Sequence, residues 1–356
     1  MNYRILVINP GSTSTKVAVY INENPLCSAT IRHTVEELAQ FESIIDQHDF
    51  RRQLVINWLK ANHIAFDFDA IIGRGGLIKP LPGGVYRVNR KMCNESYYAL
   101  RKHACNLGCV IAYELAQELN NHCIAYIADP VTVDELLPEA RVSGSPQMPR
   151  AAIWHALNQR AIARRFAHEM GKHYEDFNLI VAHLGGGISV AAHQHGRAVD
   201  VNNALDGEGP LSPERAGTLP AAELIHLCYS GRYTEEQLKK RVAGQAGLMA
   251  HLGTTDIPQI MQRIEQGDQH AKLLIDAMIF HTAKAIAAES AVFYGQVDAI
   301  LLTGGMAYAD YITQGITQRV KHLAPVHVYP GEDEMESLAL NALSVLRGEF
   351  KANEYE

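Results

Sequence analysis

The chain has 356 residues, of which 47% are hydrophobic and 20% are charged, a composition typical of a globular protein and not of a disordered or fibrous one. The net charge of −7 and the lack of dense Lys/Arg runs exclude a general nucleic-acid binder. No segment reaches the roughly 18 uninterrupted apolar residues of a membrane span, and the N-terminus lacks a signal-peptide pattern. We therefore expect a cytoplasmic protein of two domains with no membrane partner.

The first predicted elements are two short apolar strands, near residues 3–9 and 16–22, joined by the turn "NPGSTST". Gly and Pro favour a sharp turn, and its hydroxyl and backbone N–H groups can face an anion from one side. This pattern predicts a phosphate site. A plain Ser/Thr-rich turn is the alternative interpretation of the turn taken alone.

Helices and strands alternate along the next part of the chain, which indicates an α/β protein. The predicted segments are a helix at 50–63, a strand at 68–72, a helix at 96–120, a strand at 123–127 and, after a long connection, a helix at 151–170. The connection begins after Asp129 and is rich in Pro and Gly. We therefore predict a domain boundary near Asp129.

The opening pattern of strand, turn and strand recurs at residues 177–201. A second pair of similar stretches, "FDAIIGRGG" at 68–76 and "VDAILLTGGM" at 297–306, follows in the same order in each half. Two pairs in register indicate a duplicated domain. We predict one domain from residues 1–128 with a returning helix in 335–356, a second domain from 129–334, and two halves facing a nucleotide cleft.

Three Gly-rich turns are the candidate phosphate sites, because exposed backbone N–H groups bind anions. Their residues are Gly11, Ser12, Ser14 and Lys16 in the first, Gly185, Gly186 and Gly187 in the second, and Gly304 and Gly305 in the third. No Walker or Rossmann fingerprint is present, so neither of those nucleotide folds is supported.

Two histidines in the segment "AAHQHG", His193 and His195, are spaced to share one face of a strand. A zinc site needs at least a third ligand, and the sequence offers none beside them. We therefore predict that both are surface residues.

Several motifs together resemble the acetate and butyrate kinase family of short-chain carboxylate kinases, within the actin-like and ribonuclease H-like ATPase superfamily. They are "VINPGSTSTKVAVY", "HLGGGIS", "GRGGLIKPLPGGVYRVN", "DGEGPLSPERAGTLP" and "YPGEDEME", and the last three resemble the butyrate kinase branch more closely. The resemblance covers nearly the whole chain. It implies reversible, Mg²⁺-dependent transfer of a phosphoryl group from ATP to a carboxylate, by a homo-oligomer.

The resemblance also implies which side chains are catalytic. Moving a phosphoryl group between two anions requires cations around crowded negative charge and little covalent work by the protein. The matching cationic and polar residues are Arg74, His183 and Arg215, and Asp129 lies where the family places a carboxylate near metal and substrate. The residues matching the metal-associated positions are Asn9 and one of Glu332, Asp333 and Glu334, of which we favour Glu334.

One position bears on the size of the acid. Acetate kinases carry a valine two residues after the first arginine, where this chain has Gly76. A smaller residue leaves volume for added methylenes, each worth about 0.8 kcal/mol when buried. We therefore predict that butanoate fits best, with isobutyrate, propionate and acetate as alternative acceptors.

Two other functions of the same fold are open at this point. A sugar kinase would need an aspartate base to deprotonate a hydroxyl group, whereas a carboxylate is already nucleophilic, so the paired arginines favour an acid acceptor. A chaperone-type ATPase would need a peptide-binding module or a polymer interface. ATP turnover that depends on a small acid distinguishes the carboxylate kinase from both.

Overall fold

The computed structural model describes residues 2–99, 102–119 and 122–356. The chain forms two compact units. Unit 1 comprises Met1–Val133 and Asp333–Glu356, and unit 2 comprises Asp134–Glu332. Within the described residues, no helix combines the length and apolar character that a membrane span needs.

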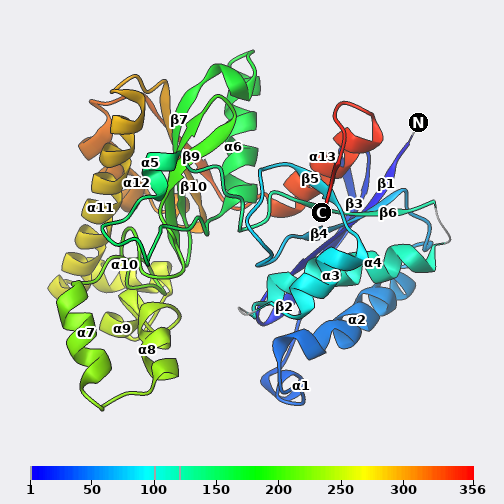
Figure 1. Cartoon of the computed structure of the whole chain (residues 1–356), viewed down its shortest axis with the longest axis horizontal. Helices are drawn as coiled ribbons and strands as arrows, with labels where there is room; N and C mark the ends of the chain where they lie inside the picture. The colour runs from blue at the N-terminus through cyan, green and yellow to red at the C-terminus, as the bar shows by residue number, and fades with distance from the viewer. Residues whose placement is uncertain (1, 100–101, 120–121) are drawn as a thin grey trace. The chain divides into compact units, whose positions relative to one another are not determined.

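Unit 1 is built on a mixed sheet with helices on both faces (Figure 1). Its strands are β1 (Arg4–Pro10), β2 (Ser14–Ile21), β3 (Asn24–Arg32), β4 (Ala70–Arg74), β5 (Val85–Arg87), β6 (Ile124–Ala128) and β12 (Asn353–Glu354). Its helices are α1 (Val35–Leu38), α2 (His48–Ala61), α3 (Arg90–Tyr97), α4 (Leu107–Glu118) and α13 (Glu334–Leu346), with the 3-10 turns η1 (Ile44–Gln47) and η2 (Ala104–Asn106).

The strand order in unit 1 is β12-β5-β6-β4-β1-β2-β3. β1, β2 and β3 form an antiparallel meander, whereas β4 and β6 run parallel to β1. The central strands β1, β4 and β6 are mostly apolar and buried because helices cover both faces of the sheet. α4 packs on one face and α13 on the other (Figure 1).

Unit 2 repeats this plan. Its strands are β7 (Asn178–Leu184), β8 (Ile188–Gln194), β9 (Arg197–Val201), β10 (Ala299–Gly304) and β11 (Val326–Pro330). Its helices are α5 (Pro138–Arg141), α6 (Ala156–Glu169), α7 (Ala221–Tyr229), α8 (Glu235–Val242), α9 (Gly247–Leu252), α10 (Ile257–Glu265), α11 (Gln269–Glu289) and α12 (Asp310–Val320), with η3 (Tyr174–Asp176), η4 (Ser290–Phe293) and η5 (Gly305–Tyr308).

The sheet of unit 2 has the order β11-β10-β7-β8-β9. Alternate residues of β7 point to two different cores: Ile180 and Ala182 pack with α11 and α12, and Leu179 and Val181 pack with α6. In Figure 1, α6 accordingly lies on the opposite face of the sheet from α11 and α12.

The two sheets share one topology. The order β6-β4-β1-β2-β3 in unit 1 corresponds strand by strand to β11-β10-β7-β8-β9 in unit 2, with the same parallel and antiparallel pairings. The two sequence repeats fall on β1-β2 with β7-β8, and on β4 with β10. The prediction of a duplicated α/β fold is therefore confirmed.

The predicted single helix at 96–120 is wrong. α3 ends at Tyr97, and α4 begins at Leu107 after the η2 turn. The break follows from His103, whose backbone is extended (φ −138°, ψ 154°) while its side chain accepts a hydrogen bond from the N–H of Cys105. Residues 100–101 and the predicted helix end at 120 lie outside the described residues.

Candidate active site

In unit 1, three predicted site residues meet at the ends of neighbouring elements. Asn9 lies near the end of β1, Arg74 ends the adjacent parallel strand β4, and Glu334 begins α13. The Glu334 carboxylate oxygen Oε2 accepts a hydrogen bond from Asn9 Nδ2 at 2.7 Å and pairs with Arg74 Nη1 at 3.0 Å. A carboxylate is stabilised at a helix N-terminus by the helix dipole, so this position suits Glu334.

The neighbouring acids differ from Glu334 in their surroundings. Asp333 is the residue that precedes α13, and Glu332 belongs to unit 2 and lies near His183. Glu334 is 5% exposed and is the acid that contacts both Asn9 and Arg74 in unit 1. A metal role for Glu334 stays a prediction.

Asp129 follows β6 and is held by the backbone of Gly84. Its N–H donates to the Gly84 carbonyl at 3.0 Å, and its Oδ1 accepts from the Gly84 N–H at 2.8 Å. The residue is buried and has φ of +38°, an uncommon conformation for a side chain other than glycine. The side-chain hydrogen bond therefore fixes a carboxylate on a strained backbone.

The first Gly-rich turn connects β1 to β2. The N–H of Gly11 donates to the Ser14 carbonyl at 2.7 Å, which closes the turn. Ser12 and Thr13 are exposed. Lys16 lies opposite Asn9 in the hairpin and its side chain is exposed, so its contact with phosphate stays a prediction.

The glycines that follow Arg74 allow close packing of the backbone. A Cβ at Gly76 would lie 2.5 Å from Asn106 Oδ1, and one at Gly108 would lie 2.2 Å from the carbonyl oxygen of Arg74. The space beside Gly76 is therefore filled by Asn106, and the argument that its small size leaves volume for substrate methylenes is wrong. A role for the Gly76 backbone in the substrate pocket stays a prediction.

In unit 2, His183 lies near the end of β7 within a group of polar side chains. Its Nδ1 is 2.7 Å from Asn158 Oδ1, so Nδ1–H donates to that amide oxygen, and its Nε2 lies 3.3 Å from Glu332 Oε1 without hydrogen-bond geometry. The ring of His155, just before α6, stacks on the His183 ring with centroids 3.9 Å apart. His155 in turn hydrogen-bonds Ser189 Oγ through Nδ1 at 2.8 Å.

Sequence reasoning missed His155. The signal that could have found it is the segment "WHALNQ", in which Asn158 and Gln159 are polar residues at buried positions of α6. Buried polar residues close to a Gly-rich turn indicate a functional site, because buried polar groups need hydrogen-bond partners. The structure thus brings two imidazole rings together where one was predicted.

The second Gly-rich turn joins β7 to β8 and packs against Arg215. A Cβ at Gly187 would lie 2.1 Å from Arg215 Nη1, so only glycine permits this approach. Arg215 Nη1 also donates to the Ala204 carbonyl. Burial lowers the pKa of the Arg215 guanidinium, whereas Glu214 and Asp206 act in the opposite direction.

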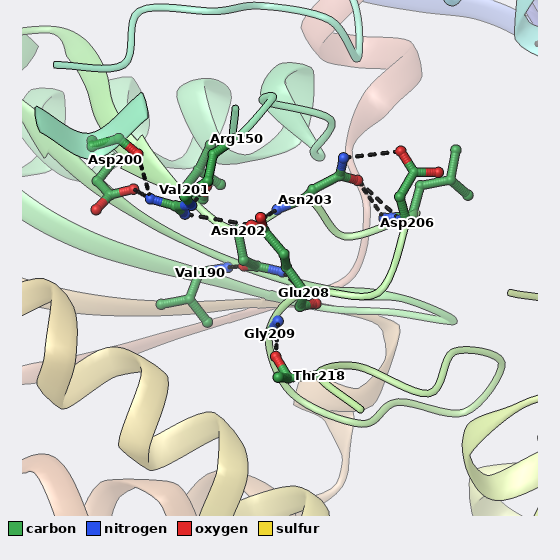
Figure 2. Close-up of polar contacts among 12 residues, drawn as sticks. Arg150, Val190, Asp200, Val201, Asn202, Asn203, Asp206, Glu208, Gly209 and Thr218 are labelled. Carbon is green, nitrogen blue, oxygen red and sulfur yellow. Dashed lines mark hydrogen bonds and ion pairs between the residues drawn. The ribbon is translucent and has the colours of Figure 1, made fainter. Parts of the chain in front are cut away.

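A polar network holds the loop that leads to Arg215 (Figure 2). Arg150 donates to Asp200 at 2.9 Å and to the Val201 carbonyl at 3.0 Å, and it lies 3.5 Å from Glu208. Glu208 also accepts from the N–H of Asn203 at 2.9 Å. Because these side chains are charged and partly buried, the network restricts the start of the loop.

The third Gly-rich turn follows β10. Gly304 has φ of +93°, and a Cβ there would lie 2.4 Å from the Leu184 carbonyl oxygen, so this position requires glycine. Gly305 has open space where a Cβ would be. An approach of nucleotide to Gly305 stays a prediction.

His193 is fully buried, so its predicted place on the surface is wrong, whereas His195 is exposed. The Nδ1 of His193 is 2.5 Å from the hydroxyl of Tyr174, and the Nε2 of His193 is 3.0 Å from Gln159 Oε1. Burial, with smaller effects of Arg160 and Arg164, lowers the pKa of His193 to about 3. The imidazole is therefore a neutral part of the core that supports α6.

The fold and these residues define a class: a duplicated α/β kinase fold with arginine and histidine beside Gly-rich turns. A similar solved structure is that of an acetate kinase from Porphyromonas gingivalis, with a TM-score of 0.80 and 16% sequence identity; the match covers 97% of this chain and 100% of that chain. Another is that of an acetate kinase from Entamoeba histolytica, with a TM-score of 0.74 and 18% sequence identity; the match covers 94% of this chain and 97% of that chain. At these identities the similarity concerns the fold alone.

Sequence comparison is more specific. A model described as the acetokinase family matches residues 150–336. A probable butyrate kinase from Bacteroides thetaiotaomicron is 62% identical, covering 99% of this chain and 100% of that protein, and butyrate kinase 1 from Clostridium acetobutylicum is 48% identical over the same shares. The chain belongs to the acetokinase family, as its motifs predict.

Proposed function

We propose that this protein is a butyrate kinase, which transfers a phosphoryl group from ATP to butanoate and releases ADP. The observation that carries this proposal is the identity of 62% over nearly the full chain with a probable butyrate kinase. We assign Arg74 in unit 1 and Arg215 in unit 2 to this reaction as its cations, and His183 as a hydrogen-bond donor.

In the reaction, a butanoate oxygen attacks the γ-phosphorus of ATP, and the bond from that phosphorus to the ADP oxygen breaks. The acid is already an anion, so no base has to remove a proton. Catalysis then consists of placing the two anions in line and neutralising their charge. The same steps in reverse make ATP from butanoyl phosphate.

Arg74 is the residue we assign to the substrate carboxylate and the transferring phosphoryl group. Its pairing with Glu334 limits the rotation of a long side chain, so less freedom is lost when the anion binds. In unit 2, His183 has its Nδ1–H held by Asn158, which orients Nε2. We assign this Nε2, when protonated, and the buried Arg215 to the phosphoryl oxygens.

The donor set of unit 1 fits Mg²⁺, because the carboxylate of Glu334 and the amide oxygen of Asn9 are hard oxygen ligands. We propose that these two residues hold the ion, directly or through water. The bound ion would neutralise negative charge on the nucleotide phosphates. We assign the Gly185 to Gly187 turn and the Gly304 to Gly305 turn to the nucleotide.

The test is a measurement of acyl phosphate formed from Mg-ATP and a panel of acids, trapped as hydroxamate with hydroxylamine. The panel contains acetate, propionate, butanoate, isobutyrate and valerate, with glucose as a hydroxyl control. We expect the highest kcat/KM with butanoate and no phosphorylation of glucose. A higher value for acetate or isobutyrate would reassign the acid, and no hydroxamate from any acid would contradict the carboxylate kinase.

A further inference from the structure

Among the described residues of unit 1, Arg51 is a charged residue with an exposed fraction of 0%. It comes from α2, where it shares the buried face of the helix with Val55 and Leu59. A charge at an apolar position of an amphipathic helix is costly unless it has a partner or a function. The guanidinium lies within hydrogen-bond distance of the backbone of the first Gly-rich turn.

Arg51 binds the carbonyl oxygens of that turn. Nη1 donates to the carbonyl of Gly11 at 2.7 Å and to that of Ser14 at 3.0 Å. Nη2 donates to the carbonyl of Ser12 at 3.2 Å. Three of the turn's acceptors therefore point toward the guanidinium.

The remaining contacts of Arg51 orient its side chain. Nε and Nη2 both donate to Gln47 Oε1, at 3.1 and 2.8 Å, and Nη1 donates to Thr15 Oγ1 at 3.2 Å. Thr15 also hydrogen-bonds His33 Nε2 at 2.9 Å. All of these partners are uncharged, so they fix the guanidinium without neutralising it.

The donors of the turn are placed differently from its acceptors. Among the described residues, the backbone N–H groups of Ser12 and Thr13 donate to no protein acceptor. Their side chains are exposed. A turn whose carbonyls bind a buried cation, and whose N–H groups at exposed residues have no protein acceptor, has the polarity of an anion site.

The charge of Arg51 has no counter-ion among the residues that the structure describes. In the part of the chain that the structure describes, no carboxylate pairs with its guanidinium. Burial lowers the pKa of Arg51 to about 10, so the side chain stays charged at neutral pH. A buried cation of this kind is compensated when an anion binds nearby.

Unit 2 provides a parallel. In the second Gly-rich turn, which belongs to unit 2, the carbonyl of Gly186 accepts a hydrogen bond from Ser212 Oγ at 2.8 Å and another from the N–H of Glu214 at 3.0 Å. The next glycine, Gly187, packs on Arg215. In both units, the segment that binds the turn's carbonyls follows the third strand of the meander, β3 in unit 1 and β9 in unit 2.

We propose that Arg51 is a positioning residue for nucleotide phosphate: it holds the carbonyl oxygens of the turn at 11–14 away from the bound phosphate and places a positive charge behind the N–H groups. This inference rests on the proposed use of ATP. It adds to the nucleotide site a residue outside the Gly-rich turns, and it assigns the first turn to phosphate and not to the acid.

The experiment compares Arg51→Met and Arg51→Lys with the matched control Arg52→Met. Arg52 is the next residue on the same helix, but it pairs at the surface with Glu114 and Glu118. Calorimetry measures the Kd for Mg-ADP, steady-state kinetics measure KM for ATP and for butanoate, and circular dichroism measures folding and Tm without ligand.

We expect Arg51→Met to raise the Kd for Mg-ADP and the KM for ATP at least tenfold, with the KM for butanoate within twofold. Arg51→Lys should raise the Kd at least threefold, because an ammonium group keeps the charge but has three N–H donors for the three carbonyls, Gln47 and Thr15, where the guanidinium has five. Arg52→Met should bind Mg-ADP as the wild type does. If Arg51→Met does not fold, Arg51→Lys carries the test alone.

A Kd for Mg-ADP within twofold of wild type in the folded Arg51 variants would overturn the proposal. An equal rise in KM for ATP and butanoate would also overturn it, because that result indicates general loss of structure. Mg-ADP binding is measured without any acid. A protein that binds Mg-ADP but phosphorylates no acid would therefore contradict the proposed function and leave the test of Arg51 intact.

Discussion

At the scale of single residues, local chemistry made some site residues predictable and others not. Arg74 and His183 lie at or near strand ends and within two residues of a glycine, a pattern visible in the sequence. Arg51 was not predicted, although its spacing of four from Val55 and of eight from Leu59 places it on the buried face of α2. The partners of Arg51 are backbone carbonyls, which no sequence pattern identifies.

Arg74 carries the first prediction. We expect Arg74→Met to lower kcat by about 10²-fold or more, since the loss of one preorganised donor to a transition-state anion has this effect. The variant also leaves Glu334 with Asn9 as its remaining partner in the cluster. Steady-state kinetics test the prediction, with Arg87→Met, an exposed arginine of the same sheet, as control. Wild-type kcat in a folded Arg74→Met protein would remove Arg74 from the reaction.

The buried histidines carry a prediction about acid stability. Burial lowers the pKa of His193 to about 3 and, with the Arg51 charge, that of His33 to about 4, both from 6.5. The unfolded chain therefore binds protons first as the pH falls below 6.5, so the free energy of unfolding decreases between about pH 6.5 and 4. His193→Gln should reduce this slope, measured as Tm against pH, and His195→Gln should not. An unchanged slope in His193→Gln would contradict the assignment.

At the scale of elements, the strands were easier to predict than the helix boundaries. The apolar strands near residues 3–9, 16–22, 68–72 and 123–127 were predicted because period and length distinguish them. The segment 96–120 contains no proline that would end a helix, whereas its break depends on the side-chain cap of His103. The contact of α4 with β4 depends likewise on Gly108, whose role is visible only once the two elements are packed.

Gly108 supplies the prediction for this contact. Gly108→Ala places a Cβ 2.2 Å from the Arg74 carbonyl oxygen, so α4 or the end of β4 has to move. We expect a loss of about 1–3 kcal/mol in the free energy of unfolding and a lower kcat, because Arg74 moves with its backbone. Denaturant unfolding and kinetics measure the two effects. The control is Gly144→Ala, where a Cβ meets nothing within 4 Å. Equal stability of the two variants would refute the packing argument.

At the scale of the whole molecule, internal repetition made the fold predictable. Two pairs of similar segments indicated a duplicated α/β domain, and the two sheets have matching strand orders. The size of the acid was not predictable in this way, because the space beside Gly76 is taken by Asn106, 30 residues along the chain. The size of a pocket depends on packing between residues that are distant in the sequence, and composition and motif spacing do not reveal that packing.

The central claim is that this chain transfers phosphate between a nucleotide and butanoate. The most direct test supplies synthetic butanoyl phosphate and Mg-ADP and follows ATP by its initial rate of formation. We predict ATP formation proportional to enzyme, faster than with acetyl phosphate and reduced about 10²-fold by Arg74→Met. No ATP above the rate without enzyme, from a folded protein, would contradict the account.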